Sequence, residues 1–340
     1  MSSTVEETGA EQSLTSVQAK FSFAKFVRTH GGQIGILGVF LGMWLFFIIA
    51  APETFLSPQI YRAFMSTIPF FAIVALPLTV LIIAGEIDLS FPSIMAIGMV
   101  AFIGVFDATG SIGLAIVAGL ITGFLAGLLN GAIVVWIGIP SLVVTIGTQF
   151  FWRGAVLVLL GGKGSTLVGV KETVTRSWLV GEVGGIPTQM IWLVLIAIAT
   201  WVLLNRHRFG ANVYVIGDEE KTARLMGINT GLTRALVFAL VGLASAFSGI
   251  LASLHVSFFW PSLGEGRLLQ TLAAVFLGGT SVFGGVGTIF GTFIGAFIIG
   301  AIEAAIVAIG LTGFWTQLIY GLIIIIAVSM HALVLRRTRR

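Results

Sequence analysis

Long apolar stretches separated by short polar connections fill the chain from residue 34 to residue 332. An α-helix needs about 20 apolar residues to cross a bilayer, so this part of the chain has room for about ten membrane-spanning helices. The apolar pattern places the spans at 34–50, 62–84, 91–106, 112–136, 139–160, 190–204, 234–254, 268–283, 288–309 and 314–332. The pattern therefore predicts an all-α integral membrane protein.

The composition points the same way. Of the 340 residues 57% are hydrophobic and 9% are charged, whereas about 25% are charged in an ordinary soluble domain. These values argue against a soluble enzyme. The chain has no cysteine and four scattered histidines, so we expect no disulfide, no metal site and no catalytic residue in it.

Lysines and arginines indicate the orientation, because basic loops resist translocation. Most of them fall on one side if the N-terminus is inside and the number of spans is even. We therefore expect both termini in the cytoplasm, with an N-terminal tail at 1–32, a transmembrane domain at 33–335 and a basic C-terminus at 336–340. The basic residues stand at span ends and not among stacking aromatic side chains, which argues against nucleic-acid binding.

Two short segments, 84–92 and 277–287, are rich in glycine or contain proline, and they interrupt the helices as broken spans or re-entrant turns. In transporters, unwound backbone at paired positions often lines a pathway, although tight turns at the membrane surface fit the hydropathy equally well. We take as candidate pathway residues Glu86, Asp88, Ser90, Thr280, Ser281 and Gly285. For Asp88 a structural role, as N-cap of the following helix, is favoured over substrate contact.

Glycines four residues apart form two stripes, one at 119, 123, 127 and 131 and one at 287, 291 and 295. Close helix packing is the favoured explanation for both stripes. Arg153 and Glu303 lie inside apolar spans, where an unpaired charge costs about 2.5–3.5 kcal/mol, and the two are a candidate pair. Together with Glu86 and Asp88 they also allow an alternative function, a proton- or ion-coupled secondary transporter that uses the four residues as a relay.

The longest inside connection, 205–233, contains a short predicted helix at 218–227. Asp218 is expected to be its N-cap, Arg224 suits the negative end of the helix dipole, and Gly227 ends the helix in a left-handed conformation. A helix of about nine residues is marginal alone, so it must pack on the bundle or on a partner protein. Three residues supply a small apolar face for that contact: Ala223, Met226 and Ile228.

Four motifs in a fixed order carry a resemblance to known proteins: IDLS at 87–90, LNG at 129–131, GDEE at 217–220 followed by ARLMGIN at 223–229, and LGGTS at 277–281 followed by GGVGT at 284–288. The chain resembles, from about residue 60 to 330, the membrane permeases of bacterial ATP-binding-cassette importers, in the branch of the ribose, xylose and galactoside permeases. Two departures stand out. Glu86 replaces a glycine of the usual pattern, and Phe91 and Pro92 replace Val-Gly, so we widen the expected substrates to monosaccharides and small polyols.

The resemblance implies a subunit of the bacterial inner membrane that dimerises, most simply with a second copy of itself. It implies a periplasmic sugar-binding protein that delivers the substrate and a separate ATPase subunit that holds ATP-Mg, while this chain binds no cofactor. The chain has no phosphate-binding loop, because Gly164 follows Lys163 where Ser or Thr is required. The resemblance further implies that the loop helix couples to the ATPase through Gly217, Asp218, Glu219, Ala223, Arg224, Met226, Gly227 and Ile228.

Overall fold

A computed structural model describes residues 23–171 and 173–338, and almost all of its regular structure is helical. The helices are α1 (Phe23–Ala50), α2 (Pro52–Phe55), α3 (Pro58–Thr67), α4 (Pro69–Ile83), α5 (Phe91–Thr109), α6 (Ile112–Ala132), α7 (Ser141–Leu160), α8 (Val174–Val180), α9 (Thr188–Arg206), α10 (Arg208–Asp218), α11 (Glu220–Leu225), α12 (Thr230–Val256), α13 (Arg267–Leu277), α14 (Ile289–Ala308) and α15 (Phe314–Thr338). A π-helical turn, Ile133–Ile137, extends α6, and a 3-10 turn, Val168–Val170, precedes α8. The predicted all-α membrane fold is confirmed.

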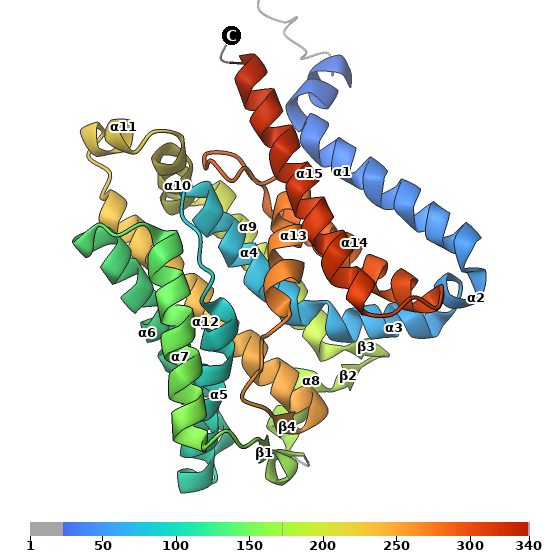
Figure 1. The fold of residues 1–340 in the computed structure, drawn as a ribbon, viewed down its shortest axis with the longest axis vertical. Helices are drawn as coiled ribbons and strands as arrows, with labels where there is room; N and C mark the ends of the chain where they lie inside the picture. Colours follow the sequence, from blue (N-terminus) through green and yellow to red (C-terminus); the bar gives the residue numbers. More distant parts are fainter. Residues whose placement is uncertain (1–22, 172, 339–340) are drawn as a thin grey trace, which may run out of the picture.

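Strands in the described part of the chain are two residues long and lie outside the spans. Strand β1 (Ser165–Thr166) pairs antiparallel with β4 (Phe258–Phe259), and β2 (Glu182–Val183) pairs antiparallel with β3 (Ile186–Pro187). Together with α8 they cover the end of the bundle opposite to α10 and α11 (Figure 1). The strands therefore cap one end and form no larger sheet.

Fewer full spans than the ten predicted are found in the described part of the chain. Among the described residues seven helices are long and apolar enough to cross a membrane, or eight if α3 and α4, which meet at a bend of 50°, count as one broken span. Helix α13 has 11 residues and is therefore about 16 Å long, half the hydrocarbon thickness. It ends at the second glycine-rich segment, whereas the apolar pattern continues to residue 283 and hides this end.

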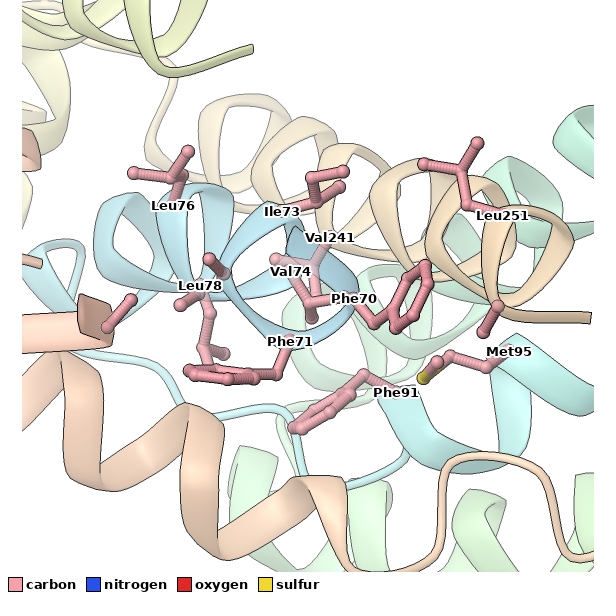
Figure 2. Packing of buried hydrophobic residues seen from close by; sticks show 14 of the residues in the cluster. Phe70, Phe71, Ile73, Val74, Leu76, Leu78, Phe91, Met95, Val241 and Leu251 are labelled. Atoms are coloured by element: carbon pink, nitrogen blue, oxygen red, sulfur yellow. The ribbon is translucent and has the colours of Figure 1, made fainter. Parts of the chain in front are cut away.

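Helix α4 is the centre of the bundle, because all of its residues are buried and all of them except Thr79 are apolar. A helix that is apolar all round belongs inside a protein or a membrane. It contacts α9, α12, α13 and α14. Figure 2 shows its side chains lying among residues of α12 and α5, such as Val241 and Met95. The two helix breaks described below start from this central helix and from α13 beside it.

The two glycine stripes are packing faces, as predicted. A Cβ atom on Gly127 would lie 2.2 Å from the Phe238 carbonyl oxygen of α12, and one on Gly123 would lie 2.4 Å from the Ala246 side chain. In the second stripe, a Cβ on Gly291 would lie 2.0 Å from the Gly278 carbonyl oxygen. Only glycine permits these backbones to approach so closely.

The first and the last helix place the two ends of the described chain at the same end of the bundle (Figure 1). Helix α1 begins and α15 ends at the end of the molecule that carries α10 and α11 (Figure 1). This arrangement agrees with the predicted placement of both termini on one side of the membrane. Helix α1 extends back to Phe23, into the predicted tail, while residues 1–22, 339 and 340 lie outside the described residues.

Candidate functional site

The first break, residues 84–90, joins α4 to α5 as a turn followed by chain without regular secondary structure. Gly85 makes the turn with φ of +85°, which favours glycine. The Ile87 backbone N–H donates to Ser141 Oγ at 3.2 Å, and Thr145 Oγ1 donates weakly to the Ile87 carbonyl at 3.5 Å. Unwound backbone at membrane depth needs such partners, so the N-terminal end of α7 satisfies the break.

Asp88, Ser90 and Asn130 form a fully buried polar cluster at the start of α5. Asp88 Oδ1 accepts hydrogen bonds from the backbone N–H and the hydroxyl of Ser90, both at 2.7 Å. Asn130 Nδ2 donates to Ser90 Oγ at 2.7 Å and, more weakly, to Asp88 Oδ2 at 3.4 Å. The prediction of Asp88 as N-cap is wrong in position, because α5 begins at Phe91 and Ser90 is its N-cap. Asp88 instead accepts two hydrogen bonds from Ser90 and holds it in place.

Glu86, at the centre of the first break, is paired with Arg234 of α12. The side chains are 10% and 15% exposed. Arg234 Nη1 also lies 2.9 Å from Glu220 Oε1 in α11, and Arg224 Nη2 lies 2.7 Å from the same oxygen. Arg234 therefore links the first break to the short helix α11 through two carboxylates.

The charges around Glu220 determine its protonation. Partial burial acts to raise the pKa of the Glu220 carboxyl, but the hydrogen bond from Arg224 and the charges of Arg234 and Arg224 outweigh it and hold the pKa below its ordinary value. Thr230 Oγ1 is a further donor at 3.4 Å. Glu220 is therefore ionised at neutral pH and remains attached to α12.

The second break, residues 278–288, is a compact loop between α13 and α14. The Ser281 backbone N–H donates to the Val286 carbonyl at 2.9 Å, and Gly279, Gly284 and Gly285 have positive φ. Thr280 and Ser281 are 1% and 2% exposed. Thr280 Oγ1 has no hydrogen-bond partner among the described residues.

The two breaks meet at one point, together with the end of α10. The Gly285 backbone N–H donates to the Ile83 carbonyl, the last of α4, at 2.9 Å. A Cβ atom on Gly217 would lie 1.6 Å from that same carbonyl oxygen, so only glycine fits there. Tyr214 of α10 also donates its hydroxyl to the Gly287 carbonyl at 2.8 Å. The predicted break segments and the predicted coupling loop thus form one junction.

The loop helix is shorter than predicted and begins later. Residue Asp218 ends α10 instead of capping the next helix, and Glu219 is the N-cap of α11, accepting from the Lys221 N–H at 3.3 Å. Helix α10 itself is not predicted from the sequence, where 218–227 is the one helix expected in this loop. The C-terminal end is as predicted: Gly227 has φ of +79°, and the Ile228 N–H donates to the Ala223 carbonyl at 3.1 Å.

The apolar residues of this helix face two ways. Ala223 is fully buried and Ile228 is partly buried, so they pack on the rest of the chain. Leu225 is 89% exposed and Met226 is 66% exposed. Leu225 and Met226 are therefore the exposed apolar residues of this segment, whereas Ala223 packs on the bundle, one of the two contacts expected for the apolar face.

The candidate pair Arg153 and Glu303 does not form. Arg153 lies 3.5 Å from Glu265, and its guanidinium donates to the Leu263 carbonyl at 3.0 Å. Glu303 instead accepts from Gln270 Nε2 at 2.8 Å. Each charge has a partner from a loop or helix that is distant in sequence, which hydropathy cannot indicate.

Sequence reasoning missed Arg234, Ser141 and Tyr214, which hold the junction together. Only Arg234 left a usable signal. It is a charged residue within the second turn of an otherwise apolar span, and such residues usually have a buried partner.

Comparison with known proteins places this arrangement in a family. Residues 60–328 match the profile of the family described as branched-chain amino acid transport system / permease component. The chain is 32% identical to a ribose import permease of Bacillus subtilis over 88% of this chain and 93% of that protein. It is 31% identical to the autoinducer 2 import permease LsrD of Yersinia enterocolitica over 78% of this chain and 81% of the relative.

A second kind of autoinducer 2 import permease, LsrC of Salmonella typhi, is 30% identical over 88% of this chain and 85% of that protein. No solved structure matches significantly. The matched region contains both breaks, the Asp88 cluster and the helix α11. The chain therefore belongs to the branched-chain amino acid transport system / permease component family and is a multi-pass inner-membrane permease of the kind that serves ATP-binding-cassette sugar importers, a transport subunit and not an enzyme.

Proposed function

We propose that this chain is the transmembrane subunit of an ATP-driven importer that moves a monosaccharide or small polyol delivered by a periplasmic binding protein. A separate ATPase subunit, which holds ATP-Mg, drives it by pressing on α11. The observation that carries the proposal is the position of α11, which exposes Leu225 and Met226 while Glu220 ties it through Arg234 to the first break.

Movement of α11 reaches the breaks along two routes. The ion pairs of Arg234 connect it to Glu86, and the end of α10 contacts the Ile83 carbonyl, which is bonded to Gly285. A displaced helix must break or drag both contacts, because packed backbones do not deform continuously. In the proposed mechanism the ATPase thus alters both breaks at once.

The proposed pathway follows the breaks, with Glu86, Asp88, Ser90, Thr280, Ser281 and Gly285 beside it. Asp88 and Ser90 are fully buried and Thr280 is nearly so, which fits a conformation in which the pathway is closed at this depth. Broken helices are tolerated in membranes where they border protein or a water-filled cavity. This supports the breaks as the moving part of the permease.

A second permease subunit completes the proposed transporter, and the relatives bear on which one it is. Salmonella typhi has two autoinducer 2 import permeases, LsrD and LsrC, and this chain is 30% identical to each. A ribose import permease is a relative of similar identity. We propose a second copy of this chain as the simplest partner, with a related permease as the other outcome of the test below.

The secondary-transporter alternative lacks support from the geometry. A proton relay needs neighbouring titratable groups, whereas Glu86 pairs with Arg234, Arg153 pairs with Glu265, and Glu303 bonds to Gln270. The four residues of the alternative therefore have separate surroundings.

The test is purification of the tagged chain in mild detergent from its own membranes, followed by identification of the proteins that accompany it and an assay of ATP hydrolysis. We expect an ATPase subunit, a second permease subunit and hydrolysis that a monosaccharide-loaded binding protein stimulates. The variant Leu225→Glu is expected to lose the ATPase subunit, because a charge replaces an apolar contact. Leu56→Glu, an exposed leucine directly after α2 and outside α10 and α11, is the matched control. Retention of the ATPase by Leu225→Glu would exclude docking at α11.

A further inference from the structure

A polar cavity of about 360 Å³ lies beside the C-terminal end of α12 and the beginning of α13. Its wall comes from α4, α5, α12, α13, α14 and α15 and from the loop 257–266. Other cavities in the described part of the chain, such as one beside Pro77 and one beside Phe290, are lined almost wholly by apolar side chains. The polar cavity is thus distinct in its chemistry from the grooves that face lipid.

A chain of polar side chains crosses this cavity. Arg267 Nη1 donates to Gln270 Oε1 at 3.0 Å, and Gln270 Nε2 donates to Glu303 Oε2 at 2.8 Å. Gln270 is 7% exposed, and these two hydrogen bonds hold its side chain in place. The Tyr320 side chain is also in hydrogen-bond contact with Gln270 and Glu303. The bond to Gln270 uses one of the five N–H groups of Arg267, and a carboxylate has about four lone-pair positions, so donors and acceptors remain for a ligand.

Aromatic side chains complete the lining. Trp260 and Phe70 are both part of the wall, and the Arg267 guanidinium carbon lies 6.0 Å from the centre of the Phe70 ring. A volume of 360 Å³ corresponds to about twelve water molecules at about 30 Å³ each, which is enough for one monosaccharide. Ligand cavities commonly start at about 300 Å³ and combine apolar walls with a few fixed polar groups.

The loop 257–266, which lines this cavity, contacts the first turn of α5, directly after the first break. Arg153 donates to the Leu263 carbonyl at 3.0 Å and to the Pro92 carbonyl at 3.3 Å, so it joins the loop to the first turn of α5. A Cβ atom on Gly264 would lie 2.4 Å from the same Pro92 oxygen. A ligand in the cavity therefore lies against the helix that begins where the first break ends.

We propose that this cavity binds the transported monosaccharide before the first break opens. Hydroxyl groups both donate and accept, which matches the Arg267, Gln270 and Glu303 chain, while the apolar face of the sugar ring packs on Trp260 or Phe70. Ionisable residues within membrane segments usually face the bundle interior or a cavity and often mark a substrate pathway, which supports a ligand role for Arg267 and Glu303. This inference rests on the proposed function, since it names the resting place of the proposed substrate.

The test is saturation-transfer difference NMR on the full chain in lipid nanodiscs, with ribose, xylose and galactose as probes. At least one sugar is expected to bind the natural chain. Its Kd is expected to rise about tenfold or more in Glu303→Gln and in Gln270→Ala, the loss that follows removal of a hydrogen bond to a charged group. Glu182→Gln is the control, because Glu182 is an exposed carboxylate outside the cavity, paired with Arg62.

Because Gln270 is buried, its replacement is checked by the unfolding midpoint, and Gln317→Ala at the exposed rim serves as a milder second variant. Absence of binding by all three sugars, or an unchanged Kd in Glu303→Gln and Gln317→Ala, would overturn the proposal. ATP hydrolysis by the purified complex separates the two proposals. Sugar binding without an associated ATPase contradicts the importer and keeps the cavity, whereas ATPase activity without sugar binding contradicts the cavity alone.

Discussion

Replacement of Arg234 by methionine tests the link between the first break and α11. The Glu86 side chain is 10% exposed, so the variant leaves its carboxylate buried without its partner, which costs about 3–5 kcal/mol. The Glu220 side chain is 38% exposed and keeps its ion pair with Arg224, so loss of its ion pair with Arg234 costs less than about 1 kcal/mol. We expect Arg234→Met to lower the free energy of unfolding by about 3–5 kcal/mol in total.

The assay is denaturant unfolding of the chain in nanodiscs, followed by tryptophan fluorescence. Arg224→Met is the matched control, because Arg224 is 67% exposed and pairs with the same Glu220 oxygen without contacting Glu86, and its cost should stay below about 1 kcal/mol. The double variant Arg234→Met with Glu86→Met should recover most of the stability, since an apolar pair of similar volume replaces a buried ion pair. A cost of Arg234→Met no larger than that of Arg224→Met, or no recovery in the double variant, would refute the reasoning.

Three further predictions concern the junction. Gly217→Ala places a Cβ atom 1.6 Å from the Ile83 carbonyl oxygen and should reduce the yield of folded protein several-fold in fluorescence-detected size exclusion. Gly227→Ala is the control, because a Cβ atom there lies in open space; its φ of +79° should lower the free energy of unfolding by only about 1–2 kcal/mol. Asp88→Ala removes the acceptor of two buried hydrogen bonds and should lower the unfolding free energy by about 2–4 kcal/mol; an unchanged midpoint with lost uptake would assign Asp88 to the pathway instead. The lowered pKa of Glu220 stabilises the fold above its ordinary value of 4.5, and this contribution is lost as the pH falls through the lowered pKa. The unfolding midpoints of the natural chain and Glu220→Gln should therefore converge between about pH 7 and about pH 3, and a constant difference would contradict the ion pairing.

The apolar pattern was sufficient for the helices but not for their ends. Long periodic or wholly apolar segments, such as α4 and α12, are visible because hydropathy alone decides that they enter the membrane. The end of α13 at Leu277 is indicated by the glycine-rich segment 277–287 and not by hydropathy. Helix α10 and the bend between α3 and α4 depend on contacts with other segments, which hydropathy does not encode. Glycine positions were more informative, since a stripe such as that at Gly127 has few explanations other than close packing.

The candidate site was predictable in its segments and not in its pairings. The motifs placed Glu86 and Asp88 in a break and Gly227 at the end of a short helix. The partner of Glu86 is 148 positions away in the sequence, and the true partner of Arg153 is a loop residue, Glu265. Charges within apolar spans reveal that partners exist, but only the packing of the bundle determines which ones they are.

The enclosed position of α4 has a consequence for how the protein is made. A helix that is apolar on every side can enter lipid as soon as it is synthesised, yet α9, α12, α13 and α14, which surround it, follow it by about 100 residues or more. Helix α4 must therefore first move from water into lipid and later replace its lipid contacts by contacts with these helices. Transfer of apolar surface from lipid to protein releases little free energy. Close backbone packing and the hydrogen bond between Thr79 and Thr292, at 2.6 Å, therefore have to drive the packing of α4 against the later helices. Compaction of the permease thus waits for its last-made helices, and a nascent chain that stops before Thr292 would hold α4 inserted in the membrane but unassembled.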